Sequence, residues 1–172
     1  MILWLHGAFG AGKTSVAAEL CRRRPELVPF DPELVGYLVR RSLPVPTGDF
    51  QDLPEWRRLV AASCAVLEDG GRRTVVTPMT LLREELAREL FDGLADRGVQ
   101  VRHVLLDVAE AELVRRIRDD GAEPGARDWR LSHVPTYAVA RPWLTALADG
   151  VVDTTGRTVD QVADEVTGAL SW

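Results

Sequence analysis

Short apolar runs alternate along this chain with longer segments in which apolar residues recur every three or four positions. Runs rich in aliphatic and β-branched residues predict five buried strands, at residues 2–5, 27–30, 74–77, 99–108 and 150–153. The longer segments predict helices at residues 15–24, 32–41, 55–68, 81–97, 110–118, 129–147 and 159–170. Pro135 and Pro142 interrupt the segment 129–147, which we therefore expect to form two helical pieces with a bend.

This alternation predicts one α/β domain over residues 1–172, with a five-stranded parallel sheet covered by helices on both faces as three layers. Ligands bind such sheets at the carboxyl ends of the strands. Gly7, Asp31, Pro78 and Asp107 all fall at predicted strand ends. The pattern therefore predicts a ligand site along that edge of the sheet.

A glycine-rich run, Gly7-Ala8-Phe9-Gly10-Ala11-Gly12-Lys13-Thr14, separates the first predicted strand from the first predicted helix. This spacing is typical of a phosphate-binding loop, in which small residues let backbone N–H groups converge on phosphate oxygens at a helix N-terminus. We expect this loop and Ser15 to bind a nucleotide, with Lys13 on its phosphates and the Thr14 hydroxyl on Mg²⁺. The alternative, a glycine turn without a ligand, is disfavoured by the strand–loop–helix setting.

The composition narrows the class of partner. The chain has 21 Lys and Arg residues, 26 Asp and Glu residues and a formal net charge of −5, which argues against a nucleic-acid binder and favours a small-molecule ligand. Lys13 is its one lysine, which indicates a site that requires a compact ammonium group. The three histidines share no metal-like spacing, and His6 is expected to pack beneath the loop. With no export signal and no membrane-spanning segment, a cytoplasmic monomer or homodimer is expected.

Asp31 is the candidate carboxylate on the acceptor side. It ends the second predicted strand, where it would accept a proton from an attacking hydroxyl or hold that hydroxyl in line with the phosphate. The alternative is a helix N-cap, because Pro32 is well suited to begin a helix. The two roles are compatible.

The end of the predicted strand at 74–77 indicates which of two classes of phosphate-loop protein this chain resembles. Hydrolysing switches and motors hold Mg²⁺ through an Asp at the end of a second apolar strand, whereas this strand ends in Thr77-Pro78. The size of the chain and this ending favour a phosphotransferase that acts on a small molecule.

A polar segment at about 119–130 follows the strand and helix of residues 99–118 and is predicted to be a short lid. This arrangement resembles the strand, helix and lid of nucleoside and nucleotide monophosphate kinases. The resemblance implies that Arg116 lies against the adenine, and that Arg118, Arg127 or Arg130 reaches the transferred phosphate. The alternative for each arginine is a solvated helix face.

The segment 47–57 combines aromatic, amide, acidic and basic groups, as in sites that hold a planar polar ligand. Asp49 or Asp52 is alternatively a helix cap. Phe50, Trp56, Trp129 and Trp143 either line an apolar groove or fill the core, and we expect core positions for at least two of them. The candidate substrate contacts here are Asp49, Phe50, Gln51, Trp56 and Arg57, with binding and structural roles left open for Gln51 and Arg57.

Four motifs together resemble the tunicamycin-resistance-type ATP-binding proteins: Trp4 to Thr14, Phe30-Asp31-Pro32-Glu33 with Gly36 and Arg40, Asp49-Phe50-Gln51 with Trp56-Arg57, and Pro78-Met79-Thr80. The resemblance implies a nucleoside-kinase-like fold, ATP at the loop and a nucleoside-like antibiotic as one candidate ligand. The uridine head of tunicamycin would suit the side formed by Asp31, residues 49–57 and Met79. One departure is Asp119-Asp120, where relatives can be more basic.

The leading hypothesis is an ATP- and Mg²⁺-dependent phosphotransferase in which Lys13, Asp31, Arg118 and Arg127 carry the chemistry. A protein that sequesters the antibiotic with ATP bound is the alternative, and a nucleotide-hydrolysing switch is the least favoured.

Overall fold

The computed structural model describes residues 1–46, 48–121 and 124–169. Its five strands form one parallel sheet in the order β2-β3-β1-β4-β5. The strands are β1 (Ile2–Gly7), β2 (Val28–Pro29), β3 (Val75–Pro78), β4 (Val101–Asp107) and β5 (Gly150–Asp153). The predicted α/β fold with a five-stranded parallel sheet is confirmed.

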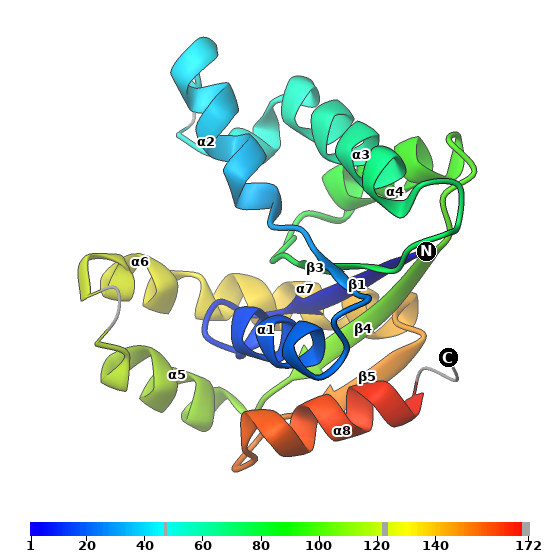
Figure 1. The fold of residues 1–172 in the computed structure, drawn as a ribbon. Coiled ribbons are helices and arrows are strands. Elements are labelled where there is room, and N and C mark those ends of the chain that lie inside the picture. The colour runs from blue at the N-terminus through cyan, green and yellow to red at the C-terminus, as the bar shows by residue number, and fades with distance from the viewer. Residues whose placement is uncertain (47, 122–123, 170–172) are drawn as a thin grey trace.

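Helices cover both faces of this sheet (Figure 1). They are α1 (Lys13–Arg23), α2 (Pro32–Ser42), α3 (Pro54–Glu68), α4 (Glu84–Ala95), α5 (Glu110–Asp119), α6 (Arg127–Ser132), α7 (Val134–Leu147) and α8 (Val159–Ala169), with short 3₁₀ turns η1 (Phe50–Asp52) and η2 (Pro124–Ala126). Residues 47, 122, 123 and 170, which fall within predicted segments, lie outside the described residues.

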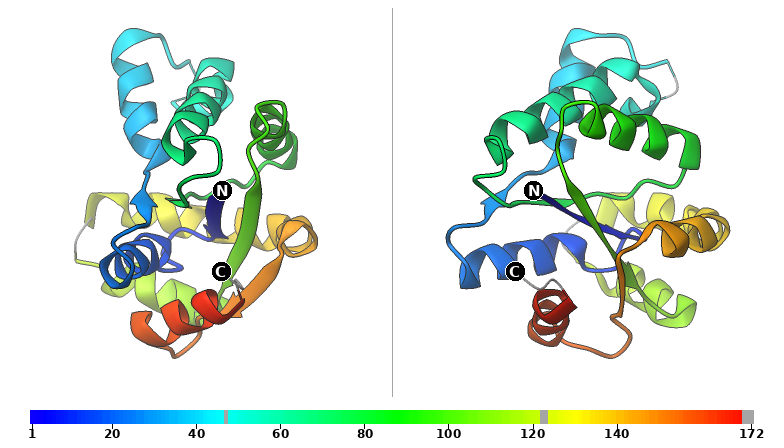
Figure 2. Two further views of the ribbon diagram at one scale, coloured as in Figure 1. Left: turned by 45° about the vertical axis from the view of Figure 1, so that its right-hand side comes forward. Right: turned by 90° about the vertical axis from the view of Figure 1, so that its right-hand side faces the viewer.

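The central strand β1 is buried along its whole length, and its side chains alternate between two apolar clusters. Leu3 and Leu5 pack against α1 and α8. Ile2 and Trp4 pack on the opposite face, against α2, α3 and α4. The views in Figure 2 agree that α1 and α8 lie together on one side of the sheet. This layering leaves the carboxyl end of β1, and the loop that follows it, between the two helical layers.

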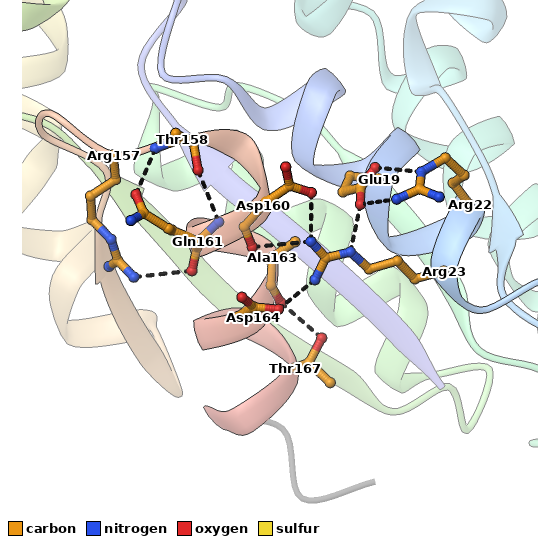
Figure 3. Close-up of polar contacts among 10 residues, drawn as sticks. All are labelled: Glu19, Arg22, Arg23, Arg157, Thr158, Asp160, Gln161, Ala163, Asp164 and Thr167. Carbon is orange, nitrogen blue, oxygen red and sulfur yellow. Dashed lines mark hydrogen bonds and ion pairs between the residues drawn. The ribbon is translucent and has the colours of Figure 1, made fainter.

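Arg23 joins α1 to α8 on the outer surface (Figure 3). Its guanidinium contacts Asp160 at 2.7 Å and Asp164 at 2.5 Å on α8, and Glu19 at 2.5 Å on its own helix. The adjacent Arg22 pairs with Glu19. The helix that begins at the loop is therefore tied to the C-terminal helix through one side chain.

The structure corrects the bounds of two predicted elements, the second strand and the fourth helix. The second strand, β2, is shorter than predicted: its last bond to β3 is from the Phe30 N–H to the Val76 carbonyl, at 3.0 Å, and the chain then enters α2 through the N-cap Asp31. The fourth helix begins at Glu84 rather than residue 81, because the chain runs on from β3 with the Met79 N–H bonded to the Leu5 carbonyl.

The last predicted helix pair, over residues 129–147, is confirmed as two pieces, but the break falls at His133. Pro135 lies in the first turn of α7, where a missing N–H costs nothing, and Pro142 lies inside α7 without ending it.

Candidate functional site

The glycine-rich loop connects the end of β1 to the start of α1, as predicted. Gly7, Gly10 and Gly12 have φ values of 148°, 88° and 94°, which side chains disfavour. At Gly7 a Cβ atom would also lie 2.7 Å from the Leu106 carbonyl oxygen. The N-cap Gly12 has no side chain to bond the N–H groups of the first turn, so these donors are open to an anion. The loop geometry therefore fits a bound phosphate.

Lys13 is almost fully buried beneath this loop. Its ammonium Nζ donates to the carbonyl oxygens of Ala8, at 2.7 Å, and Gly7, at 3.3 Å, and lies 5.8 Å from the centre of the Phe9 ring. Burial lowers the pKa of Lys13 to about 7; the Glu33 carboxylate opposes this shift and the Arg130 guanidinium adds to it. An anion at the loop would stabilise the charged form of this lysine.

His6 packs beneath the loop, as predicted. It is fully buried, and its Nε2 lies 2.9 Å from the Nδ1 of His103. Burial and, less strongly, His103 hold the pKa of His6 well below its usual value, so the ring is neutral near pH 7. Thr80, which lies just after β3, supports the loop: its hydroxyl donates to the Gly7 carbonyl at 3.0 Å. Thr80 belongs to the motif Pro78-Met79-Thr80, but the sequence reasoning gave it no role in the site.

Asp31 stands at the carboxyl end of β2 and caps α2. One of its carboxylate oxygens accepts the Glu33 N–H at 2.9 Å, so the N-cap role considered for it is confirmed. Glu33 follows in the first turn of α2, and its charge acts on Lys13 across the site. Two carboxylates therefore lie at the start of α2, and the sequence reasoning gave a role in the site only to Asp31.

The η1 turn lies next to α2. Asp49 caps it through the Gln51 N–H at 2.9 Å, and the Gln51 side-chain amide donates to the Thr80 carbonyl at 3.1 Å. The Phe50 ring packs so closely on α2 that a Cβ atom at Gly36 would lie 2.6 Å from it. Arg83, which the sequence reasoning also missed, pairs with Asp52 and lies 3.5 Å from Asp49. This turn is thus fixed to both β3 and α4.

Three of the predicted substrate contacts are buried in the structure. Trp56 is fully buried, and its indole N–H donates to the Pro32 carbonyl at 3.1 Å. Arg57 is 5% exposed and donates to the Gln51 carbonyl, at 2.6 Å, while pairing with Glu89. Met79 is also buried. These side chains lie on the inner faces of their elements and support the acceptor side from behind.

Of the two alternatives for the four aromatic residues, an apolar groove or the core, the structure shows core packing for three. Trp56, Phe50 and Trp143 pack into or against the core, whereas Trp129 is half exposed on α6. The expectation of core positions for at least two of the four is confirmed.

The lid consists of the end of α5 and α6, with residues 122 and 123 outside the described part of the chain. Arg118 and Arg127 are exposed and have no hydrogen bond or ion pair with any described residue. Arg130 pairs with Asp120 at 2.6 Å. Arg116 is held against the end of β5 by bonds to the hydroxyl and carbonyl oxygens of Thr154, at 3.1 and 2.5 Å. In Figure 1 this lid and α2 lie on different sides of the start of α1.

Asp107, at the end of β4, is fully engaged by α7. Its carboxylate accepts bonds from the Tyr137 hydroxyl, at 2.9 Å, and from Arg141, at 2.5 Å. Burial raises the pKa of Asp107, but these two donors outweigh it and hold the pKa below its usual value. β3, the other neighbour of β1, ends in Thr77 and Pro78. Within the described residues, moreover, no group of three His, Cys, Asp or Glu side chains is placed to hold a metal ion.

A search of the described helices finds none with both the length and the apolar character needed to cross a membrane. A comparison with curated protein sequences finds no significant match.

Solved structures with the same fold include several kinases. The tunicamycin resistance protein of Deinococcus radiodurans aligns over 97% of this chain and 93% of its own, with 26% identity and a TM-score of 0.71. The APS kinase of Mycobacterium tuberculosis, in complex with AMPPNP and APS, aligns over 99% and 97%, with 20% identity and a TM-score of 0.67. The shikimate kinase of Bacteroides thetaiotaomicron aligns over 100% and 99%, with 16% identity and a TM-score of 0.67.

The resemblance to tunicamycin-resistance-type proteins is thus confirmed at the level of the fold and of moderate sequence identity. A family model described as an AAA domain (AAA_33) matches residues 2–129, which span the loop, the acceptor side and most of the lid. The chain therefore belongs to this AAA domain family and has a P-loop, kinase-like fold.

Proposed function

We propose that the protein is an ATP- and Mg²⁺-dependent phosphotransferase that acts on a hydroxyl group of a nucleoside-like or antibiotic small molecule, with tunicamycin as one candidate. The observation that carries the proposal is the position of Lys13. It is a buried ammonium on the phosphate loop, with the carboxylate-bearing first turn of α2 across from it.

In the proposed reaction the acceptor oxygen attacks the γ-phosphorus of ATP. The bond from that phosphorus to the β,γ-bridging oxygen breaks, ADP leaves, and the acceptor proton passes to Asp31. Asp31 can do this while it caps α2, because the cap uses one carboxylate oxygen. Lys13 and the N–H groups of the loop hold the phosphates, and the exposed Thr14 hydroxyl is the protein ligand expected for Mg²⁺. When bound, Mg²⁺ would neutralise phosphate charge.

The remaining predicted contacts keep their places in the proposal. Arg116 would lie against the adenine, with its guanidinium oriented by Thr154. Arg118 and Arg127 are exposed cations of the lid that would bind the phosphates. Asp49, Phe50 and Gln51 form the acceptor-side turn, which Arg57 and Trp56 support from the core.

Mass spectrometry of candidate acceptors incubated with ATP, Mg²⁺ and the protein tests the proposal. A panel of uridine-containing nucleosides and tunicamycin should yield at least one product that has gained a phosphate. If no acceptor gains a phosphate while the protein binds AMPPNP, the phosphotransferase proposal is wrong.

Asp31→Asn separates catalysis from helix capping. Because Asn caps helices about as well as Asp, we expect the unfolding midpoint and AMPPNP affinity to stay close to those of the wild type. Phosphate transfer should fall by about 10²- to 10⁴-fold, since the proton acceptor is lost. Asp31→Ala, which removes the cap as well, should lower both transfer and stability. Full transfer activity in Asp31→Asn would remove Asp31 from the catalytic assignment.

The second candidate is a protein that binds the antibiotic tightly without turnover. It is favoured by the 26% identity with a protein whose printed name refers to tunicamycin resistance. It predicts that Asp31→Asn retains both tunicamycin binding and any protection of cells. Isothermal titration of Asp31→Asn with tunicamycin, with and without ATP, measures this binding. The phosphotransferase proposal requires instead that the variant lose protection together with phosphate transfer.

A further inference from the structure

Between Gly7 and Gly12 the phosphate loop carries one large side chain, Phe9. The other residues of this run are glycine or alanine, which suffices for a loop that binds phosphates through backbone N–H groups. The Phe9 ring is half-buried, and its centre lies 5.8 Å from the Lys13 ammonium. Phosphate binding by the loop therefore gives no reason for this ring, although the ring lies beside the lysine that we propose to hold the phosphates.

The Phe9 ring contacts two rings of the lid. Its centre lies 4.6 Å from that of Trp129 on α6 and 5.4 Å from that of His133, which follows α6, and the last two rings are 4.2 Å apart. Nδ1 of His133 lies 2.7 Å from the Trp129 carbonyl oxygen; because a carbonyl oxygen only accepts, Nδ1 carries a proton and the ring is held in place. Trp129 is nevertheless 50% exposed. These three residues, the aromatic platform, thus present an open aromatic surface.

The aromatic platform adjoins the acceptor side of the phosphates. Glu33 on α2 and Arg130 on α6 both act on the charge of Lys13, so both helices approach this lysine. Figures 1 and 2 show α6 nearer to α2 than α5 is. The proposed adenine contact, Arg116, lies on α5 instead and is held just beyond β5. The exposed part of Trp129 is therefore nearer to the place proposed for the acceptor than to the proposed adenine side.

We propose that the aromatic platform binds a planar, conjugated ring of the acceptor, such as a pyrimidine base, by stacking on Trp129. This proposal rests on the proposed function, because it names the class of acceptor and the residues that select it. Stacking of a base on an aromatic side chain typically changes affinity by about 5- to 100-fold. A saturated, puckered ring cannot make this contact, so the platform would select against such acceptors.

Uridine and dihydrouridine are the probes for this contact. They share the ribose and the hydrogen-bonding groups of the ring, but only the uracil ring is planar and conjugated. Titration calorimetry with AMPPNP and Mg²⁺ bound should show that the wild type binds uridine at least about fivefold more tightly than dihydrouridine. Equal affinities for the two nucleosides, or no binding of uridine to the protein with AMPPNP bound, would overturn the proposal.

Trp129→Leu removes the ring and keeps an apolar side chain. Uridine affinity should fall by about fivefold or more, to that of dihydrouridine, whereas dihydrouridine and AMPPNP affinities should change by less than about threefold. Trp129→Phe should recover most of the preference for uridine. Because Trp129 is half exposed, the unfolding midpoints of both variants should stay close to that of the wild type.

Tyr37→Leu is the matched control, because Tyr37 is an aromatic residue of similar exposure, 52%, on a different helix, α2. It should leave the preference for uridine unchanged. Three results would contradict the role of Trp129: a preference that survives Trp129→Leu, a preference that Tyr37→Leu abolishes instead, and a loss in Trp129→Leu that is confined to AMPPNP. The last of these would place the adenine on the platform.

Phe9 needs a test of position rather than contact. Phe9→Leu should lower uridine affinity by roughly twofold to fivefold at saturating AMPPNP, because Trp129 loses the ring on which it packs. In the Trp129→Leu background, Phe9→Leu should have no further effect on uridine. A full additive loss in the double variant would show that Phe9 acts independently of Trp129 and would remove it from the platform.

These titrations measure binding without phosphate transfer, so they separate the two proposals. If uridine binds through Trp129 but no acceptor gains a phosphate, the phosphotransferase proposal fails and the role of the platform in binding stands. If transfer occurs and Trp129→Leu treats uridine and dihydrouridine as the wild type does, the assignment of the platform fails alone.

Discussion

At the scale of single residues, Lys13 has the most distinctive chemistry. Its burial lowers its pKa to about 7, although lysines in water titrate above 10. The loop thus holds an ammonium group that loses its proton near neutrality unless an anion binds beside it.

This predicts that nucleotide binding takes up a proton. At pH 8.5 Lys13 is mostly neutral in the free protein, and the phosphates of AMPPNP raise its pKa again, so binding should be coupled to the uptake of up to one proton. Affinity should therefore fall as the pH rises above 7, by at most about tenfold per unit. Calorimetry in two buffers of different ionisation enthalpy measures the uptake.

Lys13→Arg is the control for this coupling, because a guanidinium stays charged at pH 8.5. Whatever its affinity, the variant should bind without proton uptake. Binding by the wild type with no proton exchange at pH 8.5 would mean that Lys13 is charged in the free protein.

Gly36 and Gly93 give a second test at this scale, because both are helical glycines with different surroundings. Alanine in a helix normally stabilises a protein by about 0.4–1 kcal/mol relative to glycine. At Gly36 the new methyl group would lie 2.6 Å from the Phe50 ring, so Gly36→Ala should instead destabilise by about 1–3 kcal/mol. At Gly93 the nearest atoms are 3.7 Å away, and Gly93→Ala should stabilise.

Denaturant unfolding of the two variants measures these changes in free energy. We predict that the free energy of unfolding falls in Gly36→Ala and rises in Gly93→Ala. If both variants gain stability, Phe50 does not pack on α2 in solution.

At the scale of elements, Arg23 holds α8 against α1. Arg23→Ala should loosen α8, and hydrogen exchange of the α8 amides should rise by roughly threefold or more, while exchange in β1 and β4 changes little. Arg22→Ala is the matched control, because the adjacent Arg22 pairs only within α1 among the described residues. Equal effects of the two variants would mean that the contacts to α8 contribute nothing.

Periodicity predicted most elements within a few residues of their observed ends, because strand and helix patterns are local. The prediction from periodicity failed where contacts between elements determine where a helix begins or ends. The start of α4 is displaced because the chain after β3 bonds to β1 and Leu81 is drawn into the core. Pro142 was expected to interrupt a helix, yet α7 continues past it, packed on the sheet through residues such as Leu144.

At the scale of the whole molecule, the two sides of the site differ in how far the sequence predicts them. The phosphate loop is contiguous, so its spacing alone identifies Lys13 and the glycines. The proposed acceptor side and the lid depend on contacts between segments that lie far apart in the chain. No pattern in the sequence places Trp129 on Phe9 or Thr80 on Gly7, and composition alone does not tell a buried Trp56 from one that contacts a ligand.

The proposed acceptor side and the nucleotide side of the site also occupy separate stretches of the sequence. Residues 31–83 contain β3 and the proposed acceptor side, whereas the phosphate loop and the lid lie before and after them in the chain. Under the proposed function, a recombination event that replaced this one stretch would exchange the proposed acceptor side and leave the phosphate loop and the lid in place. A protein with this fold could therefore change its acceptor through replacement of one continuous segment. The new segment would have to keep Thr80 or an equivalent donor that bonds to the Gly7 carbonyl.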